Sequence, residues 1–310
     1  MKFLCKTSKL QQALNQVSRA ISNQQALPIL GNVLIHVEGK RCTISATDLE
    51  LSIVTSFEAS IENEGKITVP AKAILNFAQY NTDEEVLLET HEGTQLKLTS
   101  AHAKTVISGE AASEYPTISR IEKETSFTLE AQPLLEALHM VTFASAKTTL
   151  RPVLSGVYIH TDKNNLVLVA TDSYRLSEYK LPINGDAADI SCIIPTKVLE
   201  ELKSILGSYK GEKKTKGDDV DIAPETNVAT INIVLSHQQI EVTVGHTQLL
   251  SRLIDGKFPN YKQIIPSDKK TKIAVSTKEL ATITKRMHYF AKETNNNLTF
   301  TAQKSDNTVH

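Results

Sequence analysis

The chain repeats itself at one spacing, and this repetition constrains its fold more than any other feature of the sequence. Pro28-Ile29-Leu30 is echoed by Pro152-Val153-Leu154, and Ala46-Thr47-Asp48 by Ala170-Thr171-Asp172, each 124 positions later. Chance matches would not keep one register across separate motifs, and a fixed period marks a tandem array of structural units. The sequence therefore predicts at least two copies of one supersecondary unit.

Each unit shows the same order of helical and strand patterns. The first begins with a helix over 8–21 and the second with a helix over 133–146, and alternating strands follow each helix. A second, shorter helix opens at Pro70 or Pro195, where a residue without an N–H is tolerated. We expect an α+β fold of tandem-repeated domains, each with two helices and antiparallel sheets.

The repeat predicts three domains, over 1–122, 123–253 and 254–310. The third begins with a helix over 277–292, in which Met287 repeats Met140 at a spacing of 147. A strand over 298–302 follows, and then a polar turn and the last few residues. A repeat cannot bury its apolar face with half of its strands missing. We therefore expect the third repeat to be incomplete, with its apolar stripe unpacked at Leu280, Ile283, Met287 and Phe290.

Composition argues against several classes of protein. The formal net charge is −1, whereas a protein that grips nucleic acid by charge alone has a marked basic excess. Cys5, Cys42 and Cys192 are scattered and odd in number, which does not suit a disulfide framework or a zinc site. The N-terminus is charged too early for a signal peptide, and no apolar run approaches the length of a membrane span. We expect a cytoplasmic protein that does not associate with membranes.

The sequence contains no motif for catalysis. It lacks a phosphate-binding GxxxxGK[ST] loop, an HExxH metal pair and a GxSxG nucleophile turn. Asp48 and Asp172 resemble paired carboxylates, but each lies between a strand and a turn at the same place in its repeat. Aspartate in such a position caps local N–H groups. We expect no catalytic residue, no metal ligand, no cofactor and no enzyme activity.

Five segments together carry a family likeness: Leu27–Asn32, Ala46–Glu50, Arg151–Leu154, Ala170–Leu176 and Asp255–Tyr261. In order, spacing and tandem repetition they resemble the bacterial DNA polymerase III beta subunits, the sliding clamps, over all 310 residues. The resemblance implies DNA-clamp domains with two helices inside and sheets outside. It also implies a head-to-tail ring of two three-domain subunits that encircles duplex DNA and gives the replicative polymerase its processivity.

The partners also follow from the resemblance. They are duplex DNA, the replicative DNA polymerase, the clamp-loader complex and other clamp-binding replication and repair proteins, with a homodimer if the third domain is complete. One alternative is a truncated or divergent clamp copy that cannot close a ring and acts only as a protein-interaction module. Another is an unrelated enzyme on a repeated α+β scaffold, against which the missing catalytic motifs argue.

Basic residues lie on the polar faces of helices that, by the resemblance, line the ring. Lys278, Lys285 and Lys292 recur every seven residues and share one helix face. An ordinary solvated face is the alternative. Phosphate contacts from such a surface hold a duplex without specifying its sequence. We expect DNA contacts at Lys9, Arg19, Lys72, Lys197, Lys203, Lys278 and Lys285 and, by the resemblance alone, at Gln24, Lys147 and Thr148.

The resemblance also implies a partner-peptide pocket between the second and third domains. An apolar cleft with a few polar groups at its rim suits an extended peptide with aliphatic or aromatic anchors. Plain core packing is the alternative, especially for the leucines. Ser173 and Tyr174 differ from the Gly-His pair of some family members. The matching residues are Leu154, Thr171, Ser173, Tyr174, Arg175, Leu176, Pro259 and Ile264.

Overall fold

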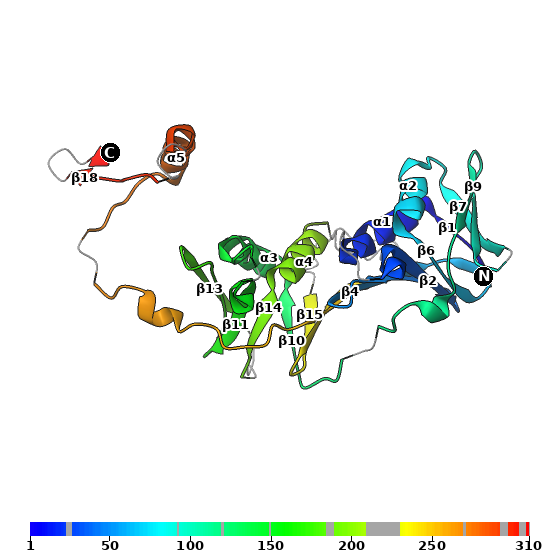
Figure 1. The fold of residues 1–310 in the computed structure, drawn as a ribbon, viewed down its shortest axis with the longest axis horizontal. Coiled ribbons are helices and arrows are strands. Elements are labelled where there is room, and N and C mark those ends of the chain that lie inside the picture. Colours follow the sequence, from blue (N-terminus) through cyan, green and yellow to red (C-terminus); the bar gives the residue numbers. More distant parts are fainter. Residues whose placement is uncertain are drawn as a thin grey trace, which may run out of the picture. The chain divides into compact units, whose positions relative to one another are not determined.

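Helices and strands follow one another twice in the same order, as the repeated sequence predicts. The computed structural model describes residues 1–22, 27–91, 93–118, 121–148, 150–183, 189–208, 230–268, 271–291, 297–303 and 308–309. The chain divides into two units, Met1–Phe258 and Pro259–His310. Both complete repeats lie in the first unit (Figure 1).

In the first repeat, α1 (Thr7–Val17) follows β1 (Lys2–Lys6), and α2 (Ala71–Tyr80) follows β6 (Gly65–Pro70). A 3-10 turn, η1 (Ser18–Ala20), extends α1. The other strands of this repeat are β2 (Asn32–Glu38), β3 (Arg41–Thr47), β4 (Leu51–Glu58), β5 (Ser60–Asn63), β7 (Glu85–His91), β8 (Gln95–Thr99) and β9 (Lys104–Ser108).

In the second repeat, α3 (Ala131–Val141) follows β10 (Thr125–Glu130), and α4 (Thr196–Ser208) follows β14 (Ser191–Pro195). The 3-10 turn η4 (Thr142–Ala144) extends α3 as η1 extends α1. The remaining elements are η5 (Pro152–Leu154), β11 (Gly156–Asp162), β12 (Asn165–Thr171), β13 (Leu176–Pro182), β15 (Thr230–Leu235), β16 (Gln239–Val244) and β17 (Thr247–Arg252).

The first helix of each repeat buries the same apolar stripe. Leu10, Ala13, Leu14 and Val17 of α1 recur as Leu134, Ala137, Leu138 and Val141 of α3, and all eight are buried. This spacing places the four side chains on one helix face. Both α-helices end earlier than the patterns predicted, because the chain tightens into η1 and η4 at Ser18 and Thr142.

One sheet runs through both repeats. Its eight strands have the order β10-β15-β16-β17-β4-β3-β2-β6, so β17 of the second repeat pairs with β4 of the first. In the antiparallel register Leu249 is opposite Ile53 and Thr247 is opposite Thr55. Leu249 is 1% exposed and Ile53 is fully buried. The two repeats thus share backbone hydrogen bonds and a core at this pairing, which we call the β17–β4 junction.

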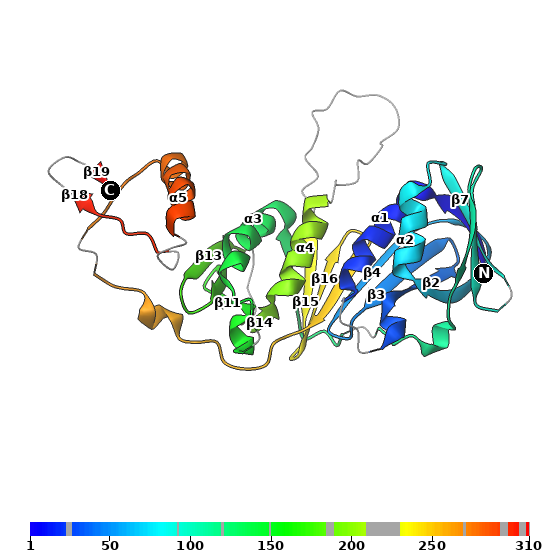
Figure 2. The same cartoon turned by 45° about the horizontal axis from the view of Figure 1, so that its top comes forward.

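Two smaller sheets complete the first unit. They have the orders β5-β1-β7-β8-β9 and β13-β12-β11-β14. The four α-helices lie along one side of these sheets, with α1 beside α2 and α3 beside α4 (Figures 1 and 2). The polar faces of the helices are consequently turned away from the strands.

A buried tyrosine ties the end of the first repeat to its start. The Tyr115 hydroxyl donates to the carbonyl oxygen of Asn32 and accepts from the amide of Thr47, each at 3.2 Å. Burial raises the pKa of Tyr115 to about 12, so the hydroxyl keeps its proton. Phe258 holds the equivalent place in the second repeat, where it has no hydroxyl and instead stacks on Tyr158 at 5.1 Å.

The second unit contains η6 (Tyr261–Ile264), α5 (Thr277–Ala291), β18 (Ala302–Gln303) and β19 (Thr308–Val309). The prediction of a strand over 298–302 was wrong for most of its length. Among the described residues, the two-residue strand β18 pairs only with β19, Ala302 with Val309 and Gln303 with Thr308. The predicted apolar stripe of α5 is exposed, at 37% for Leu280, 51% for Ile283, 45% for Met287 and 66% for Phe290. No helix in the described part of the chain is long and apolar enough to cross a membrane.

Replacement of Tyr115 by phenylalanine tests the tie between Asn32 and Thr47. The substitution keeps the ring but leaves a buried carbonyl and a buried amide without the hydroxyl. We expect the free energy of unfolding to fall by about 1–3 kcal/mol in urea titrations. Tyr80→Phe is the matched control, because Tyr80 is 72% exposed. Equal stability of the two variants would contradict this role of Tyr115.

Candidate nucleic-acid interface and docking site

Most of the predicted DNA-contacting residues of the first unit lie at exposed helix positions or in one exposed loop. Lys9 is on α1, Arg19 on η1, Lys72 on α2 and Lys197 on α4, and all four are exposed. Lys203 of α4 is partly buried. Lys147 and Thr148 are exposed in the loop between η4 and η5, while Gln24 lies outside the described residues.

Two of these cations form ion pairs between the repeats. The Lys197 ammonium lies 2.6 Å from Asp48 Oδ2, and Arg19 Nη1 lies 3.1 Å from Glu201 Oε2. Lys203 has a local partner, Glu200, at 2.8 Å, and donates to Thr142 Oγ1 at 3.1 Å. These three cations therefore make contacts within the protein as well as adding positive charge to its surface.

The other basic residues predicted to contact DNA differ from these three in their ion pairing. Within the described part of the chain, Lys9, Lys72 and Lys147 have no carboxylate at ion-pair distance. Lys278 and Lys285 are exposed on α5, which belongs to the second unit, and Lys292 lies outside the described residues. The role of all these residues in DNA binding stays a prediction.

Between α1 and α4 lies a groove of about 400 Å³ that the sequence did not reveal. Its walls carry uncharged amide and hydroxyl groups together with the Arg19 guanidinium. Its position depends on the β17–β4 junction, which brings together helices almost 200 residues apart in the chain. The lining residues are Ser8, Gln11, Gln12, Asn15, Gln16, Arg19, Ser204, Ile205 and Ser208.

The turn between β12 and β13 is built in the same way as the turn between β3 and β4. Asp172 Oδ1 accepts from the amides of Tyr174 and Arg175 at 3.0 Å, as Asp48 Oδ1 accepts from Glu50 and Leu51. The structural role predicted for both aspartates is thereby confirmed. Partial burial alone would raise the pKa of Asp172, but these hydrogen bonds and the Arg175 charge outweigh it and hold the pKa below its usual value.

This turn exposes part of the predicted peptide pocket. Thr171 Oγ1 accepts from the Ser173 amide at 3.1 Å and donates to the Arg175 carbonyl at 2.7 Å, which supports a positive φ of 77° at Ser173. Tyr174 is consequently 98% exposed. The Arg175 guanidinium lies 5.6 Å from the centre of the Phe143 ring, on η4.

Leucines form the apolar part of the same region. Leu154 is buried on η5. Its carbonyl oxygen accepts a hydrogen bond at 2.8 Å from the amide of Ala146, which lies just after η4. Leu176 is half-buried at the start of β13. The turn, η4 and η5 are thus neighbours within the first unit. Pro259 and Ile264 are exposed residues of the second unit, so their place in the pocket stays a prediction.

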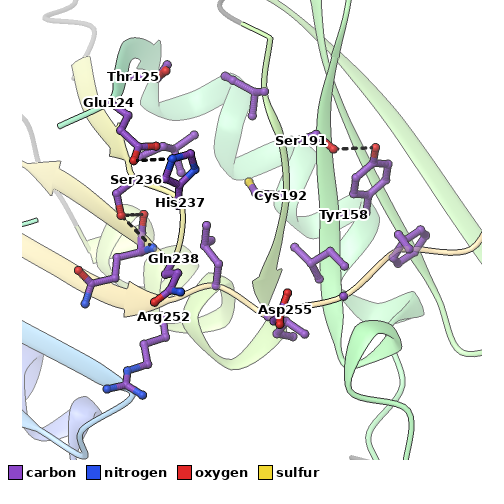
Figure 3. Close-up of a pocket in the computed structure, with 18 of the residues that line it drawn as sticks. Glu124, Thr125, Tyr158, Ser191, Cys192, Ser236, His237, Gln238, Arg252 and Asp255 are labelled. Carbon is purple, nitrogen blue, oxygen red and sulfur yellow. Dashed lines mark hydrogen bonds and ion pairs between the residues drawn. The ribbon is translucent and has the colours of Figure 1, made fainter. Parts of the chain in front are cut away.

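A separate cleft of about 1040 Å³ opens beside β14, and the sequence predicted none of its residues (Figure 3). The turn between β15 and β16 forms one wall, where His237 Nε2 lies 3.2 Å from Glu124 Oε1. On the other wall the hydroxyls of Tyr158 and Ser191 are 3.2 Å apart. Cys192 also lines it, but burial raises the pKa of this thiol to about 12, so it is a poor nucleophile near neutral pH.

Comparisons with known proteins identify the repeated unit. The family model of the DNA polymerase III beta subunit N-terminal domain matches residues 1–119, and the model of its central domain matches residues 128–260. The chain belongs to the DNA polymerase III beta subunit family. The two family domains therefore correspond to the two repeats of the first unit.

Relatives and solved structures agree with this assignment. The beta sliding clamp of Haemophilus influenzae is 30% identical over 86% of this chain and 68% of its own. That of Synechocystis is 29% identical over 99% of this chain and 80% of its own. The crystal structure of the Bartonella birtlesii DnaN sliding clamp, bound to griselimycin, is 27% identical with a TM-score of 0.82, and the match covers 92% of this chain and 73% of that one.

The ion pair between Arg19 and Glu201 can be tested by removing the charge of Glu201. Because Arg19 is about half exposed, we expect Glu201→Gln to lower the free energy of unfolding by only about 0.2–1 kcal/mol at low salt. Screening should remove most of the difference at about 1 M NaCl. Urea titrations at both salt concentrations measure it, with Glu136→Gln as the control because Glu136 is exposed on α3. A difference that does not change with salt would argue against an electrostatic contact.

Proposed function

We propose that this chain is a DNA sliding clamp for the replicative DNA polymerase, organised as clamp domains over 1–122, 123–253 and 254–310. The single observation that carries the proposal is the pair of matched family domains joined by one continuous sheet at the β17–β4 junction. A clamp acts by enclosing its substrate, so it requires a rigid curved frame and no catalytic group. On this proposal the chain binds duplex DNA and the polymerase and is not itself an enzyme.

The proposed DNA surface is formed by the polar faces of the helices. α1, α2, α3 and α4 lie on one side of the first unit (Figure 2). Lys9, Lys72 and Lys147 offer exposed cations, and the groove between α1 and α4 offers amides and hydroxyls that can donate to phosphate oxygens. Such contacts track the backbone without reading bases. With a net charge of −1, the protein has only local positive regions, which suits a mobile contact.

The enclosure of DNA can be tested with nicked circular DNA. We expect the protein, loaded with a clamp loader and ATP, to remain on the circle during gel filtration and to leave once the circle is cut. Retention must not depend on sequence. Equal retention on circular and linear DNA, or no retention on either, would contradict the proposal.

Charge reversal tests which residues face the DNA. The triple variant Lys9→Glu, Lys72→Glu and Lys147→Glu should shorten the lifetime on circular DNA and weaken its dependence on salt, because each lost phosphate contact reduces counterion release. Lys66→Glu, an exposed change on β6, is the control. If the triple variant and the control are retained alike, these lysines do not face the DNA.

The peptide site is proposed around the turn between β12 and β13. Its support is the exposed Tyr174, the half-buried Leu176 and the nearby Phe143, which form an apolar surface beside polar groups. A homologous clamp is bound to griselimycin in its crystal structure. The proposed partners are the polymerase, the clamp loader and other clamp-binding proteins. We also propose a homodimer, formed through a complete third domain.

Replacement of Leu176 by aspartate tests the peptide site. A charge in an apolar site loses its hydration without gaining a partner, so the affinity for a polymerase-derived peptide with aliphatic and aromatic anchors should fall about tenfold or more. Fluorescence anisotropy measures the affinity. Thr128→Asp, an exposed substitution on β10, is the control. Unchanged affinity in the Leu176 variant would reject the site.

A further inference from the structure

Lys203 of α4 makes its polar contacts within the protein rather than with solvent. Only 16% of its side chain is exposed, whereas that of Lys197 on the same helix is 52% exposed. The Lys203 ammonium donates to Thr142 Oγ1 at 3.1 Å and lies 2.8 Å from Glu200 Oε2, one turn earlier on α4. An ammonium group has three donors, so most of its hydrogen-bonding capacity is used inside the first unit. Lys203 is therefore poorly placed to hold a phosphate.

Thr142, which accepts this hydrogen bond, is the first residue of η4. It is 3% exposed, and its hydroxyl donates in turn to the Leu138 carbonyl at 2.9 Å. The Thr142 carbonyl accepts from Ser145 Oγ at 2.8 Å, which closes the turn. Because the donor is charged, the bond from Lys203 is stronger than one between neutral groups. Lys203 thus holds η4 against α4, which lies beside α3 (Figure 2).

The η4 turn also carries contacts to two parts of the proposed peptide site. Phe143 directly follows Thr142, and the centre of its ring lies 5.6 Å from the Arg175 guanidinium. Just after η4, the Ala146 amide donates to the Leu154 carbonyl at 2.8 Å. The contact between Lys203 and η4 is therefore connected both to the turn between β12 and β13 and to η5.

The first repeat lacks this arrangement. The counterpart of Thr142, 124 positions earlier, is Ser18, whose buried hydroxyl has no hydrogen-bond partner in the described part of the chain. The counterpart of Lys203, 125 positions earlier, is Ala78, which is 1% exposed. The lysine contact thus occurs in the repeat whose turn carries the proposed peptide site. It is missing from the repeat whose equivalent turn contacts α4 instead.

We propose that Lys203 is a positioning residue for peptide binding and not a DNA contact, a role that rests on the peptide site proposed above. By donating to Thr142 it fixes η4, and η4 holds the Phe143 ring beside Arg175 at the edge of that site. Lys203 itself does not touch the peptide. Its replacement therefore weakens peptide binding by loosening η4 and leaves the DNA contacts unchanged.

Removal of the ammonium group tests this role. Lys203→Met keeps the apolar stem, and the Glu200 side chain, which is 46% exposed, can be hydrated without its partner. We expect the affinity for the polymerase-derived peptide, measured by fluorescence anisotropy, to fall about three- to tenfold, as for one coupled contact. Lys97→Met is the matched control, because Lys97 is a partly exposed lysine beside Glu89 in the first repeat. Equal affinities of the two variants would overturn the proposal.

Substitutions of Thr142 separate positioning from a general loss of stability. Thr142→Val removes the acceptor and should lower the peptide affinity as Lys203→Met does. Thr142→Ser keeps a hydroxyl, as Ser18 does in the first repeat, and should bind the peptide like the unmodified chain. If Lys203 acts through this hydroxyl, the double variant Lys203→Met and Thr142→Val should bind no more weakly than the weaker single variant. Additive losses, or a serine variant as weak as the valine variant, would contradict the proposal.

A fluorescent reporter on η4 tests the positioning directly. The sequence contains no tryptophan, so Phe143→Trp introduces a single indole ring beside Arg175. In time-resolved fluorescence anisotropy, adding Lys203→Met should increase the motion of this ring on the nanosecond timescale, whereas adding Lys97→Met should not. A ring that moves equally in all three chains would show that Lys203 does not hold η4.

Two comparisons keep this role separate from the proposed function. If Leu176→Asp lowers the peptide affinity and Lys203→Met does not, the peptide site stands and the role of Lys203 is rejected. If neither substitution changes the affinity, the peptide site itself is rejected. On circular DNA, Lys203→Met should be retained as long as the unmodified protein at each salt concentration. A shorter lifetime with a weaker dependence on salt would assign Lys203 to the DNA surface and overturn the proposal.

Discussion

The backbone pairing of β17 with β4 is the constraint on which the rest of the first unit depends. It turns two four-stranded sheets into one eight-stranded sheet and thereby fixes the position of one repeat relative to the other. The junction contains a buried hydrogen bond between the hydroxyls of Thr55 and Thr247, which are 2.9 Å apart. It also has an apolar core, formed by the buried side chains of Ile53 and Leu249. Ladder hydrogen bonds and burial together make it a rigid joint between the two repeats.

Electrostatics supports this joint from the helix side. Arg19 with Glu201 and Lys197 with Asp48 connect the repeats through cations that are about half exposed and carboxylates that are partly buried. Because water reaches both cations, each pair stabilises only modestly. The same cations lie on the helix face that we propose as the DNA surface. A phosphate approaching Arg19 or Lys197 would compete with a carboxylate of the protein, so binding there exchanges one weak contact for another. That exchange suits a clamp that must move along its substrate.

The sequence predicted the parts of the structure that repeat locally. Because the motifs recur in one register, the helices of both repeats and the capping role of Asp48 and Asp172 followed from pattern alone. The pairing of Thr55 with Thr247 did not, because it joins residues 192 positions apart and no local signal marks it. The groove between α1 and α4 and the contact of Arg19 with Glu201 depend on that pairing, so they were missed for the same reason. The predicted strand after α5 was wrong for most of its length. Alternation of apolar and polar residues indicates which face of a strand would be buried, but it does not supply a neighbouring strand to pair with.

Hydrogen–deuterium exchange of dilute protein tests the central claim most directly, namely that the β17–β4 junction is a structural joint rather than an adventitious contact. Peptides from β4 and β17 should be protected to the same degree as those from β3, an interior strand of the same sheet, and should lose protection together in denaturant. β9 and β13, each of which pairs with one strand in the described part of the chain, serve as internal references and should exchange faster. Exchange of β4 and β17 at the rate of β9 and β13 would contradict the account.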